Sequence, residues 1–500
     1  MDHPEISGDV AAAARDAVDA LWARDHRPWG EMPDEITDRL GWLDAPDRAV
    51  EEIPHLQALA RAVIADGCTS ALLVGMGGSS LYPQVLAGLA DPSAVSFGVL
   101  DSTDPAAVLA AEAGDWTSTL LVPASKSGTT IETRSHLDYF SSRLQAAGVT
   151  PPGGRIVAVT DPHSALDEVG ARDYLAVVHG QPDVGGRFSA LTAFGLWPAA
   201  LLGIDLAAHV APARDALERA RSGDLGVNDG AALGAVLAQA ARGGRDKLTL
   251  LVPDTLADFA AWVEQLVAES TGKHGRGLLP VLGETPDTAS FGNDRIVVVM
   301  DLAGDDGTDH RSFGDAPVVR WRVDGAASIA AEVVRWEVAT AVCSALLGVN
   351  AFDQPDVARA KAATQRVLAA GEELPRPGDP GALLDTLSPG DYVALLGFVT
   401  PGGGDEAALH RAGARIRARY EVPVTVGIGP RYLHSTGQYH KGGRDRGVFL
   451  VVVGDDPVDV DIPGRDMTFG RLKRAQAAGD LAAFDELGRR ATHVALDDLL

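Results

Sequence analysis

Residues 72–84, LLVGMGGSSLYPQ, join a short apolar strand to a helix through a glycine-rich turn. Glycine allows the backbone of such a turn to approach a ligand closely. The helix that follows presents free N–H groups and the positive end of its dipole to the same place. The stretch therefore predicts a strand of a parallel α/β sheet, followed by a turn that is suited to an anion.

Apolar strands and helices continue to alternate on the C-terminal side of this turn. This alternation predicts parallel sheets covered by helices on both faces, and the nearly continuous apolar character of the strands fits burial on both faces. The alternation restarts after a mostly helical stretch at 190–222 and 229–242. Strands are expected at 71–75, 95–101, 119–125, 155–160, 247–253, 295–301, 317–323, 392–399, 422–429 and 447–454.

A chain of 500 residues is too long for a single core, so several packed units are expected. The fold class is α/β, with two doubly wound parallel-sheet subdomains and helical additions at both ends. We expect an N-terminal helical segment at 1–66, a first α/β domain at 67–225 and a second at 226–500. The Pro- and Gly-rich segment 372–381 is interpreted as a linker or a long loop.

The composition excludes several classes of protein. A net charge of −26 disfavours nucleic acid as a partner, because nucleic acid requires a basic surface. The sequence has no signal core and no apolar run of about 18 residues, so we expect no membrane segment and a cytoplasmic location. Cys68 and Cys343 form neither a disulfide framework nor a paired metal motif, and we expect no metal and no cofactor.

A second polar loop follows the strand at 119–125, within LLVPASKSGTTIET at 120–133. Clustered hydroxyls before a helix suit a phosphate monoester, although a plain capped loop would look similar. Two such loops at the ends of neighbouring strands meet in one crevice, which favours the phosphate site. The expected binding residues are Gly78, Ser79, Ser125, Lys126, Ser127, Thr129 and Thr130.

A dinucleotide site is the main alternative for the glycine-rich turn. Asp101 ends the next strand, where an acidic residue could bind a ribose. The pattern, however, has Gly75 and Gly77 followed by Ser80, so the third glycine of a dinucleotide motif is missing.

Two further segments carry candidate catalytic side chains. Arg187 follows a Gly-Gly turn, where its N–H donors could face an anionic intermediate. The alternative interpretation is that Arg187 forms a surface ion pair. Glu269 lies in the last turn of a helix expected to end near Gly272, and Gln265 lies one turn earlier on the same face. A partly buried carboxylate near the negative end of a helix suits a general base, and a solvated glutamate is the alternative.

Taken together, these motifs resemble a known family. GMGGSS and SKSGTTIET resemble the sugar isomerase (SIS) domain, which binds phosphosugars. GGRFS and AESTGK, which follow in this order, resemble the phosphoglucose isomerase family. The resemblance covers about residues 70–445 and is closest to the isomerase portion of transaldolase–phosphoglucose isomerase fusions. It implies that both α/β subdomains have the SIS fold.

The resemblance also implies further site residues. NAFDQPDVARAK, residues 350–361, places Gln354 in the substrate site and Lys361 among the catalytic residues. GPRYLHSTGQYHKGG, residues 429–443, places a catalytic histidine at His434, with His440 as a rival in the same loop. In better-known members the histidine segment precedes the lysine segment, whereas here the order is reversed.

The family implies a cofactor-independent aldose–ketose isomerase that interconverts glucose 6-phosphate and fructose 6-phosphate through a cis-enediol. His434 and Lys361 would open the sugar ring, Glu269 would move the proton between C2 and C1, and Arg187 would stabilise the intermediate. The family also implies a homodimer. The sequence leaves mannose 6-phosphate open as a second substrate.

Three other classes of protein are weighed. A phosphosugar-sensing regulator would need a basic DNA-binding segment, but residues 1–66 are acidic. A nicotinamide-dependent dehydrogenase would need the dinucleotide site. An amidotransferase would need an N-terminal nucleophilic cysteine, and none precedes Cys68.

Overall fold

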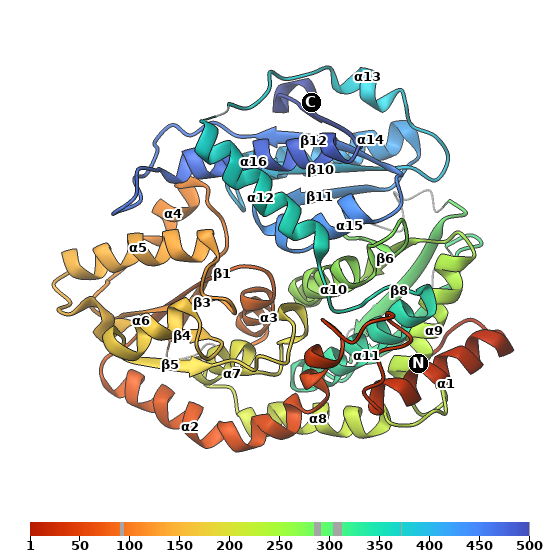
Figure 1. Ribbon diagram of the computed structural model, residues 1–500, viewed down its shortest axis with the longest axis horizontal. Helices are drawn as coiled ribbons and strands as arrows, with labels where there is room; N and C mark the ends of the chain where they lie inside the picture. The colour runs from red at the N-terminus through yellow and green to blue at the C-terminus, as the bar shows by residue number, and fades with distance from the viewer. Residues whose placement is uncertain (91–94, 285–291, 304–312, 372, 500) are drawn as a thin grey trace.

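The computed structural model describes residues 1–90, 95–284, 292–303, 313–371 and 373–499. In this part of the chain, three parallel β-sheets are covered by helices (Figure 1). The predicted α/β class with parallel sheets is confirmed. The helices of the first half are α1 (Gly8–Trp22), α2 (Ala45–Ala65), α3 (Leu81–Leu89), α4 (Pro105–Ala111), α5 (Ile131–Ala146), α6 (Ala165–Asp173), α7 (Ala193–Leu201), α8 (Leu206–Arg219) and α9 (Asp229–Arg242). Those of the second half are α10 (Ala257–Thr271), α11 (Ile329–Leu347), α12 (Pro355–Ala370), α13 (Pro380–Leu384), α14 (Gly404–Tyr420), α15 (Gly437–Gly442) and α16 (Phe469–Glu486).

The first sheet has the strand order β2-β1-β3-β4-β5. Because β1 pairs directly with β3, with Gly75 opposite Ala124, the two polar loops that follow these strands lie side by side. The sequence analysis predicted four of the five strands and missed the short β5. The strands are β1 (Ser70–Gly75), β2 (Ser96–Leu100), β3 (Thr119–Ala124), β4 (Val157–Thr160) and β5 (Ala176–His179).

The second sheet has the order β7-β6-β8-β9 and lies beside the first. Both sheets pack against one continuous core, which also contains the apolar faces of α1, α2, α9 and α11. The strands are β6 (Lys247–Leu251), β7 (Leu279–Val281), β8 (Arg295–Leu302) and β9 (Val318–Val323).

The C-terminal strands form a third sheet of their own, with the order β11-β10-β12-β13. The sequence analysis placed these strands within the unit 226–500 and did not separate them. All residues of β10 are buried, and they alternate between two cores: Tyr392 and Ala394 face one, Val393 and Leu395 the other. Among the described strands, none of this layer pairs with a strand of the second sheet, so the layer is a separate sheet. The strands are β10 (Tyr392–Phe398), β11 (Val424–Ile428), β12 (Gly447–Val453) and β13 (Arg490–His493).

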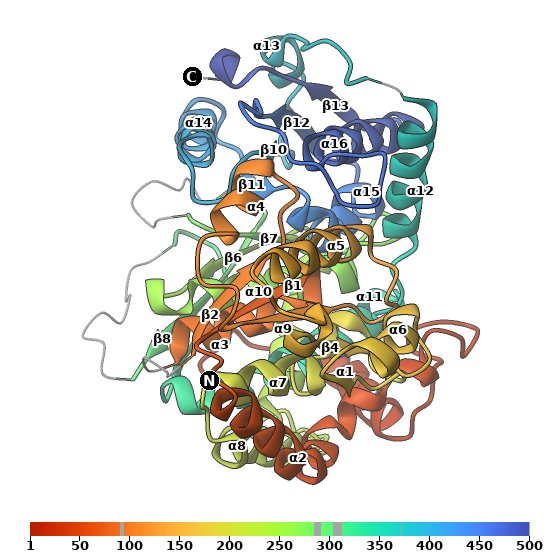
Figure 2. The same cartoon turned by 90° about the vertical axis from the view of Figure 1, so that its left-hand side faces the viewer.

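The third sheet lies above the other two in Figure 1, and helices connect the layers. Ala268 of α10 belongs to the core under the third sheet. Phe469 and Leu472 of α16 pack into the outer core of the first sheet, with Phe140 of α5. Helix α12 lies against α16, as Figures 1 and 2 both show. The third layer is therefore attached to both of the others.

Glu337 is an ionisable group within the helical core. It lies on α11 with 2% of its surface exposed, and no described residue contacts its Oε1 atom through a hydrogen bond. Burial raises the pKa of Glu337 well above its usual value. Replacing Glu337 by methionine should therefore stabilise the protein by about 1 to 3 kcal/mol, the usual penalty for an unsatisfied buried polar group.

The stabilisation by Glu337→Met should grow as the pH rises. In the unfolded chain this glutamate ionises near its ordinary pKa, whereas in the folded protein it keeps its proton, so the wild type loses stability as the pH rises above that value. The difference in melting temperature between variant and wild type should accordingly be larger at pH 8 than at pH 5. Glu218→Met, at an exposed position of α8, is the control, and an equal difference at both pH values would contradict the prediction.

Candidate active site

The loop after β1 touches the loop that carries Arg187. Gly77 has a φ of +57°, a conformation that glycine adopts without strain. A Cβ atom on Gly78 would lie 1.9 Å from the carbonyl oxygen of Gly186, so a side chain at this position would force the two loops apart. The glycines expected to approach a ligand are thus also required for packing, and they bring Arg187 beside the first loop.

The loop after β3 presents its hydroxyls together. The Ser125 and Thr130 hydroxyl oxygens lie 3.0 Å apart, and those of Ser127 and Thr129 lie 2.9 Å apart. Ser127 and Thr129 are exposed, and α5 begins directly after Thr130. Hydroxyls at a helix N-terminus suit a phosphate group. The predicted cluster therefore has the right composition and position for such a group.

Lys126 and Ser79 lie differently within these loops. Lys126 forms an ion pair with Asp161 and donates to the carbonyl oxygen of Gln181 at 3.0 Å. Its ammonium group is thus directed toward the loops after β4 and β5, where it already has partners. Ser79 is half-buried at the end of the 3₁₀ turn of the first loop.

Arg187 is held rigidly inside the protein. Its side chain is buried, and its Nε donates to Ser270 Oγ at 2.7 Å. Nη1 donates to Gln354 Oε1 at 2.9 Å, and Nη2 donates to the carbonyl oxygen of Ala351 at 2.5 Å. The same Nη1 lies 3.4 Å from Glu269 Oε1. The predicted residues Arg187, Glu269 and Gln354 are therefore in direct contact.

Glu269 lies in the last turn of α10, as predicted, and its side chain is buried. Gln265, one turn earlier, donates from Nε2 to Glu269 Oε2 at 3.1 Å and to the carbonyl oxygen of His434 at 2.8 Å. Gln265 Oε1 is buried and has no hydrogen-bond partner among the described residues. The glutamine thus connects the glutamate to the histidine loop and retains a free acceptor in the site.

His434 ends a 3₁₀ turn that follows β11 in the third sheet. Its Nε2 lies 3.0 Å from Glu132 Oε1, on the first turn of α5. Burial by itself would raise the pKa of Glu132, but His434 and Lys361 nearby lower it to about 2. Glu132 is thus ionised at neutral pH and accepts a hydrogen bond from the imidazole.

Lys361 and His434 line the same pocket, although their segments occur in the reverse of the usual order. The pocket has a volume of about 200 Å³ and also includes Thr129, Thr130 and Glu132. Lys361 extends from α12, and its side chain is exposed. The third sheet supplies the histidine and α12 supplies the lysine, and both side chains reach the pocket beside the loop after β3.

His440 lies away from this pocket, in the core of the third sheet. It is 1% exposed, and its Nδ1 lies 3.0 Å from the hydroxyl oxygen of Tyr392. Its ring also packs against Phe449. Burial, with Lys441 and Arg489 nearby, lowers the pKa of His440 to about 3. Of the two histidines, His434 is therefore the one that faces the candidate site.

Asp101, considered above as a ribose-binding residue, is engaged within the protein. Arg431 donates to both of its carboxylate oxygens, from Nε at 2.7 Å and from Nη2 at 2.9 Å. Asp101 is 3% exposed. Since Arg431 begins the turn that ends at His434, this ion pair fixes the histidine loop to the first sheet. The geometry does not favour a dinucleotide site at this carboxylate.

Glu132, Gln476 and Lys273 belong to the site region but were not among the predicted site residues. Glu132 lies inside the quoted motif SKSGTTIET, and Lys273 inside AESTGK. Burial, with Arg187 nearby, lowers the pKa of Lys273 to about 7, and its Nζ lies 3.0 Å from Asp353. Motif membership could have identified these two residues. Gln476 lies in α16, where the sequence carries no such signal.

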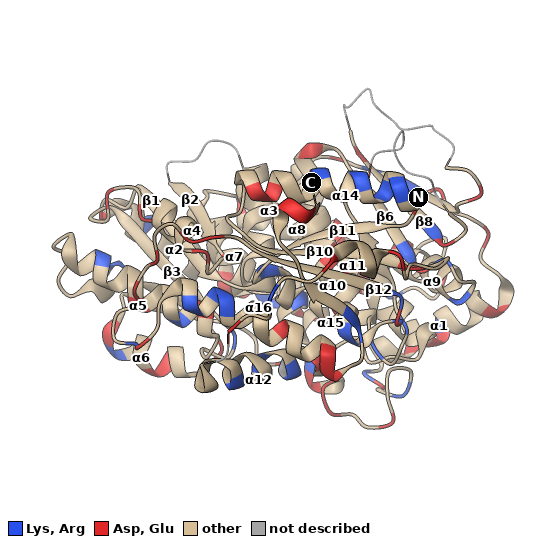
Figure 3. Cartoon of the chain, turned by 90° about the horizontal axis from the view of Figure 1, so that it is seen from above, with Lys and Arg blue, Asp and Glu red and all other residues tan. Residues whose placement is uncertain are grey.

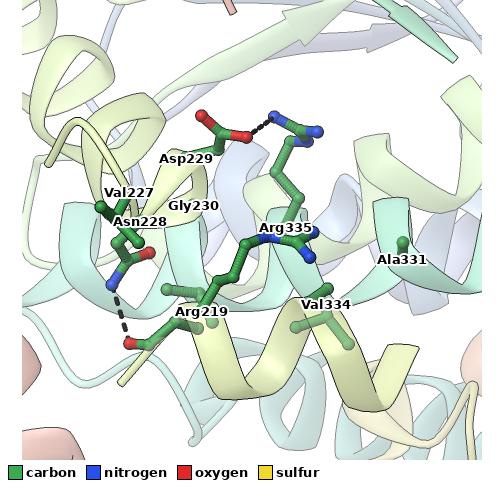
Figure 4. A pocket seen from close by; sticks show the side chains of 11 residues that line it. Arg219, Val227, Asn228, Asp229, Gly230, Ala331, Val334 and Arg335 are labelled. Carbon is green, nitrogen blue, oxygen red and sulfur yellow. Dashed lines mark hydrogen bonds and ion pairs between the residues drawn. The ribbon is translucent and has the colours of Figure 1, made fainter. Parts of the chain in front are cut away.

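A smaller pocket lies elsewhere among the described residues. The pocket between α8, α9 and α11 has a volume of about 30 Å³ and admits water only (Figure 4). There Asn228 donates to the carbonyl oxygen of Ala220 at 2.7 Å, and Arg335 pairs with Asp229 at 3.1 Å. The described part of the chain contains no group of His, Cys, Asp and Glu side chains arranged to hold a metal ion. None of its described helices has the length and apolar character needed to span a membrane.

Comparison with solved structures agrees with the fold. A hypothetical protein from Thermus thermophilus is 26% identical, with a TM-score of 0.62 over 72% of this chain and 95% of that one. A glucose-6-phosphate isomerase from Chlamydia trachomatis has a TM-score of 0.54 at 20% identity, over 73% of this chain and 79% of that one. The second likeness shows the fold alone.

Sequence comparison gives the family. The phosphoglucose isomerase family model matches residues 61–277. Glucose-6-phosphate isomerase of Rubrobacter xylanophilus is 30% identical over 376 residues, which cover 61% of this chain and 84% of that protein. The enzyme of the same name from Synechococcus elongatus is 31% identical over 386 residues, covering 66% of this chain and 72% of its own length. With this coverage added to the geometry of Glu269, Arg187 and the two loops, the chain belongs to the phosphoglucose isomerase family.

Proposed function

We infer that this chain is a glucose-6-phosphate isomerase, which interconverts glucose 6-phosphate and fructose 6-phosphate. One observation carries the inference beyond family membership: Glu269 and Arg187 are buried in contact with each other, beside two adjacent loops suited to a phosphate. A general base, an anion-stabilising cation and a remote anchor are what an enediol mechanism requires.

The phosphate of the substrate is proposed to bind at the hydroxyls of Ser79, Ser125, Ser127, Thr129 and Thr130 and at the backbone of Gly78. Lys126 adds positive charge nearby while it remains paired with Asp161. Because the phosphate does not react, its binding energy serves to orient the sugar carbons.

Ring opening is proposed to occur at His434. The imidazole, held by Glu132, transfers a proton between the ring oxygen and the C1 hydroxyl, and the ammonium group of Lys361 attracts the oxygen that becomes charged. The C–O bond of the ring breaks, a carbonyl forms at C1, and the C5 oxygen gains the proton.

Isomerisation is proposed to follow at Glu269. Its carboxylate removes the C2 proton, the electron pair forms the C1–C2 double bond, and the carbonyl oxygen takes the negative charge of a cis-enediolate. The proton of the C2 hydroxyl passes to the C1 oxygen, Glu269 delivers its proton to C1, and a carbonyl forms at C2. Arg187 stabilises the negative charge on the oxygens, and Gln265 Oε1 is free to accept a sugar hydroxyl. Neither the substrate nor the enzyme changes its net redox state.

The direct test follows the conversion of fructose 6-phosphate to glucose 6-phosphate, measured with an excess of glucose-6-phosphate dehydrogenase. A purified chain without this activity would overturn the proposal. The same preparation incubated with mannose 6-phosphate shows whether the site also accepts the C2 epimer, because a planar enediol at C2 can lose its configuration.

The proposed phosphate site makes a separate prediction. Ser127→Ala should raise the KM for fructose 6-phosphate about tenfold, the usual effect of losing a hydrogen bond to a charged group. The turnover number should change little, because the phosphate is bound equally in the substrate complex and in the transition state. Steady-state kinetics and the inhibition constant of inorganic phosphate measure the two effects.

Ser388→Ala, in an exposed loop before β10, is the matched control for Ser127→Ala and should leave both constants unchanged. If the Ser127 variant lost turnover while KM and phosphate inhibition stayed at wild-type values, the loop would have a role other than phosphate anchoring.

The remaining expectations concern partners and location. We propose a cytoplasmic homodimer that binds phosphosugar and not nucleic acid. The net charge of −26 supports the absence of nucleic acid, as do the Lys and Arg positions, which are interspersed with Asp and Glu along the ribbon (Figure 3). Light scattering of the purified protein measures its molar mass directly.

A further inference from the structure

Gln476 connects the third layer of the protein to the proposed ring-opening histidine. It lies on α16, is 2% exposed, and donates from Nε2 to Glu132 Oε1 at 2.7 Å. The same carboxylate oxygen lies 3.0 Å from His434 Nε2. The carboxylate thus has two donors on one oxygen, one from the helix and one from the histidine loop.

Thr103 fixes the orientation of the Gln476 amide. Its hydroxyl donates to Gln476 Oε1 at 2.7 Å. Because the amide oxygen is taken by this contact, the amide nitrogen must face Glu132. The reversed amide would place two acceptor oxygens against each other at this distance, so the threonine and the carboxylate select the same orientation.

The loop that contains Thr103 is itself held by the third layer. Asp101 forms an ion pair with Arg431, and Asp104 forms an ion pair with Lys473 of α16 at 2.9 Å. Asp104 also accepts from Thr400, after β10, at 2.8 Å. The turn after β2 is therefore a fixed support, and Gln476 is one of several contacts from the third layer to it.

The arrangement determines which ring nitrogen of His434 is available. An ionised carboxylate only accepts hydrogen bonds, so the histidine Nε2 that faces Glu132 must carry a hydrogen. The other nitrogen, Nδ1, is then the atom that exchanges a proton with substrate. If Glu132 turned or became protonated, the imidazole could adopt the other tautomer, as when the orienting partner of a catalytic histidine is altered.

We propose that Gln476 is a positioning residue for the isomerisation: together with Thr103 it orients Glu132, and through Glu132 it fixes which nitrogen of His434 faces the sugar ring. This rests on the proposed function. It assigns part of the catalytic apparatus to α16, which lies outside residues 61–277 matched by the family model.

The first test removes the amide. Gln476→Met keeps the length of the side chain but cannot donate to Glu132. We expect kcat for fructose 6-phosphate to fall about tenfold, the scale of one hydrogen bond to a charged group, while KM stays within about twofold. Gln145→Met, on an exposed part of α5, is the matched control and should retain wild-type kinetics.

The second test uses pH within one protein. In Gln476→Glu the new carboxyl can donate a hydrogen bond to Glu132 only while it holds a proton, and two adjacent carboxyls share one proton over an extended pH range. We expect kcat near that of the wild type at pH 6 and a fall toward the methionine variant by pH 9. The titratable groups around Glu132 are His434, Lys361 and His136, and all three are unchanged in this variant.

The outcomes separate this inference from the proposed function. Wild-type kinetics of Gln476→Met at full thermal stability, or a pH profile of Gln476→Glu that parallels the wild type, would overturn it. If Gln476→Met does not fold, the pH series on Gln476→Glu still tests the inference. If neither variant folds, Thr103→Val must lower kcat at unchanged KM.

NMR of ¹⁵N-labelled histidine reports the tautomer of His434 without turnover. An Nε2-protonated His434 in the wild type that changes in Thr103→Val would support the positioning even in a chain that did not isomerise fructose 6-phosphate.

Discussion

Replacing Glu269 by glutamine is expected to lower the turnover number for fructose 6-phosphate at least about a hundredfold, the usual contribution of a general base. Glutamine has nearly the same shape and can still contact Gln265, which lies 3.1 Å from the carboxylate. It cannot accept the C2 proton. Stopped-time assays coupled to glucose-6-phosphate dehydrogenase measure the loss, and KM should change much less than kcat.

Solvent exchange isolates the step that Glu269 performs. In deuterium oxide the wild type should place deuterium on the sugar at C1 and C2, because the base exchanges its proton between abstraction and return, whereas Glu269→Gln should not. Glu218→Gln, at an exposed position of α8, is the control for the loss of one negative charge. A Glu269→Gln variant that turned over at a near-normal rate would show that another group acts as the base.

Arg187→Lys is expected to lower kcat about a hundredfold as well, the scale seen when one donor to a developing oxyanion is removed. Arginine is held by four groups through three nitrogens and keeps Nη1 3.4 Å from Glu269. Lysine retains the charge but not the fork, so its ammonium group cannot satisfy these partners and face the enediol as well. Steady-state kinetics give the loss in kcat.

Two measurements keep the Arg187 prediction distinct from unfolding. The melting temperature establishes whether Arg187→Lys is folded. Relative to the wild type, the variant should lose much more affinity for a hydroxamate analogue of the enediol than for inorganic phosphate. Arg219→Lys, on the surface of α8, is the control. Equal losses for the analogue and for phosphate would assign Arg187 a structural role only.

Much of the fold follows from local patterns in the sequence. The strand and helix around the first glycine-rich turn are where the pattern predicts, and α10 ends at Thr271, which places Glu269 in its last turn. The strands β5, β7 and β13, which have three or four residues each, were missed. The third sheet could not be separated from the second, because strand pairing is a tertiary choice that local hydrophobicity does not specify.

The site was predictable to the extent that its motifs were contiguous. Arg187, Glu269, Gln265 and Gln354 were each identified from a short block, and the structure places them in contact. Glu132 was not singled out, because an acidic residue in the first turn of a helix is favourable for any helix. Only its contact with a turn that lies 302 residues away gives it a role in the site.

The ion pair between Asp101 and Arg431 has a consequence for the binding of redox coenzymes. Redox coenzymes are abundant in cells. A doubly wound sheet with a glycine-rich turn is a common binding site for them, in which an acidic residue after the second strand binds the adenosine ribose. Here the acidic residue, Asp101, forms an ion pair with Arg431 of the same chain. Arg431 belongs to the same 3₁₀ turn as His434. We therefore expect that Asp101 does not bind the ribose of a redox coenzyme.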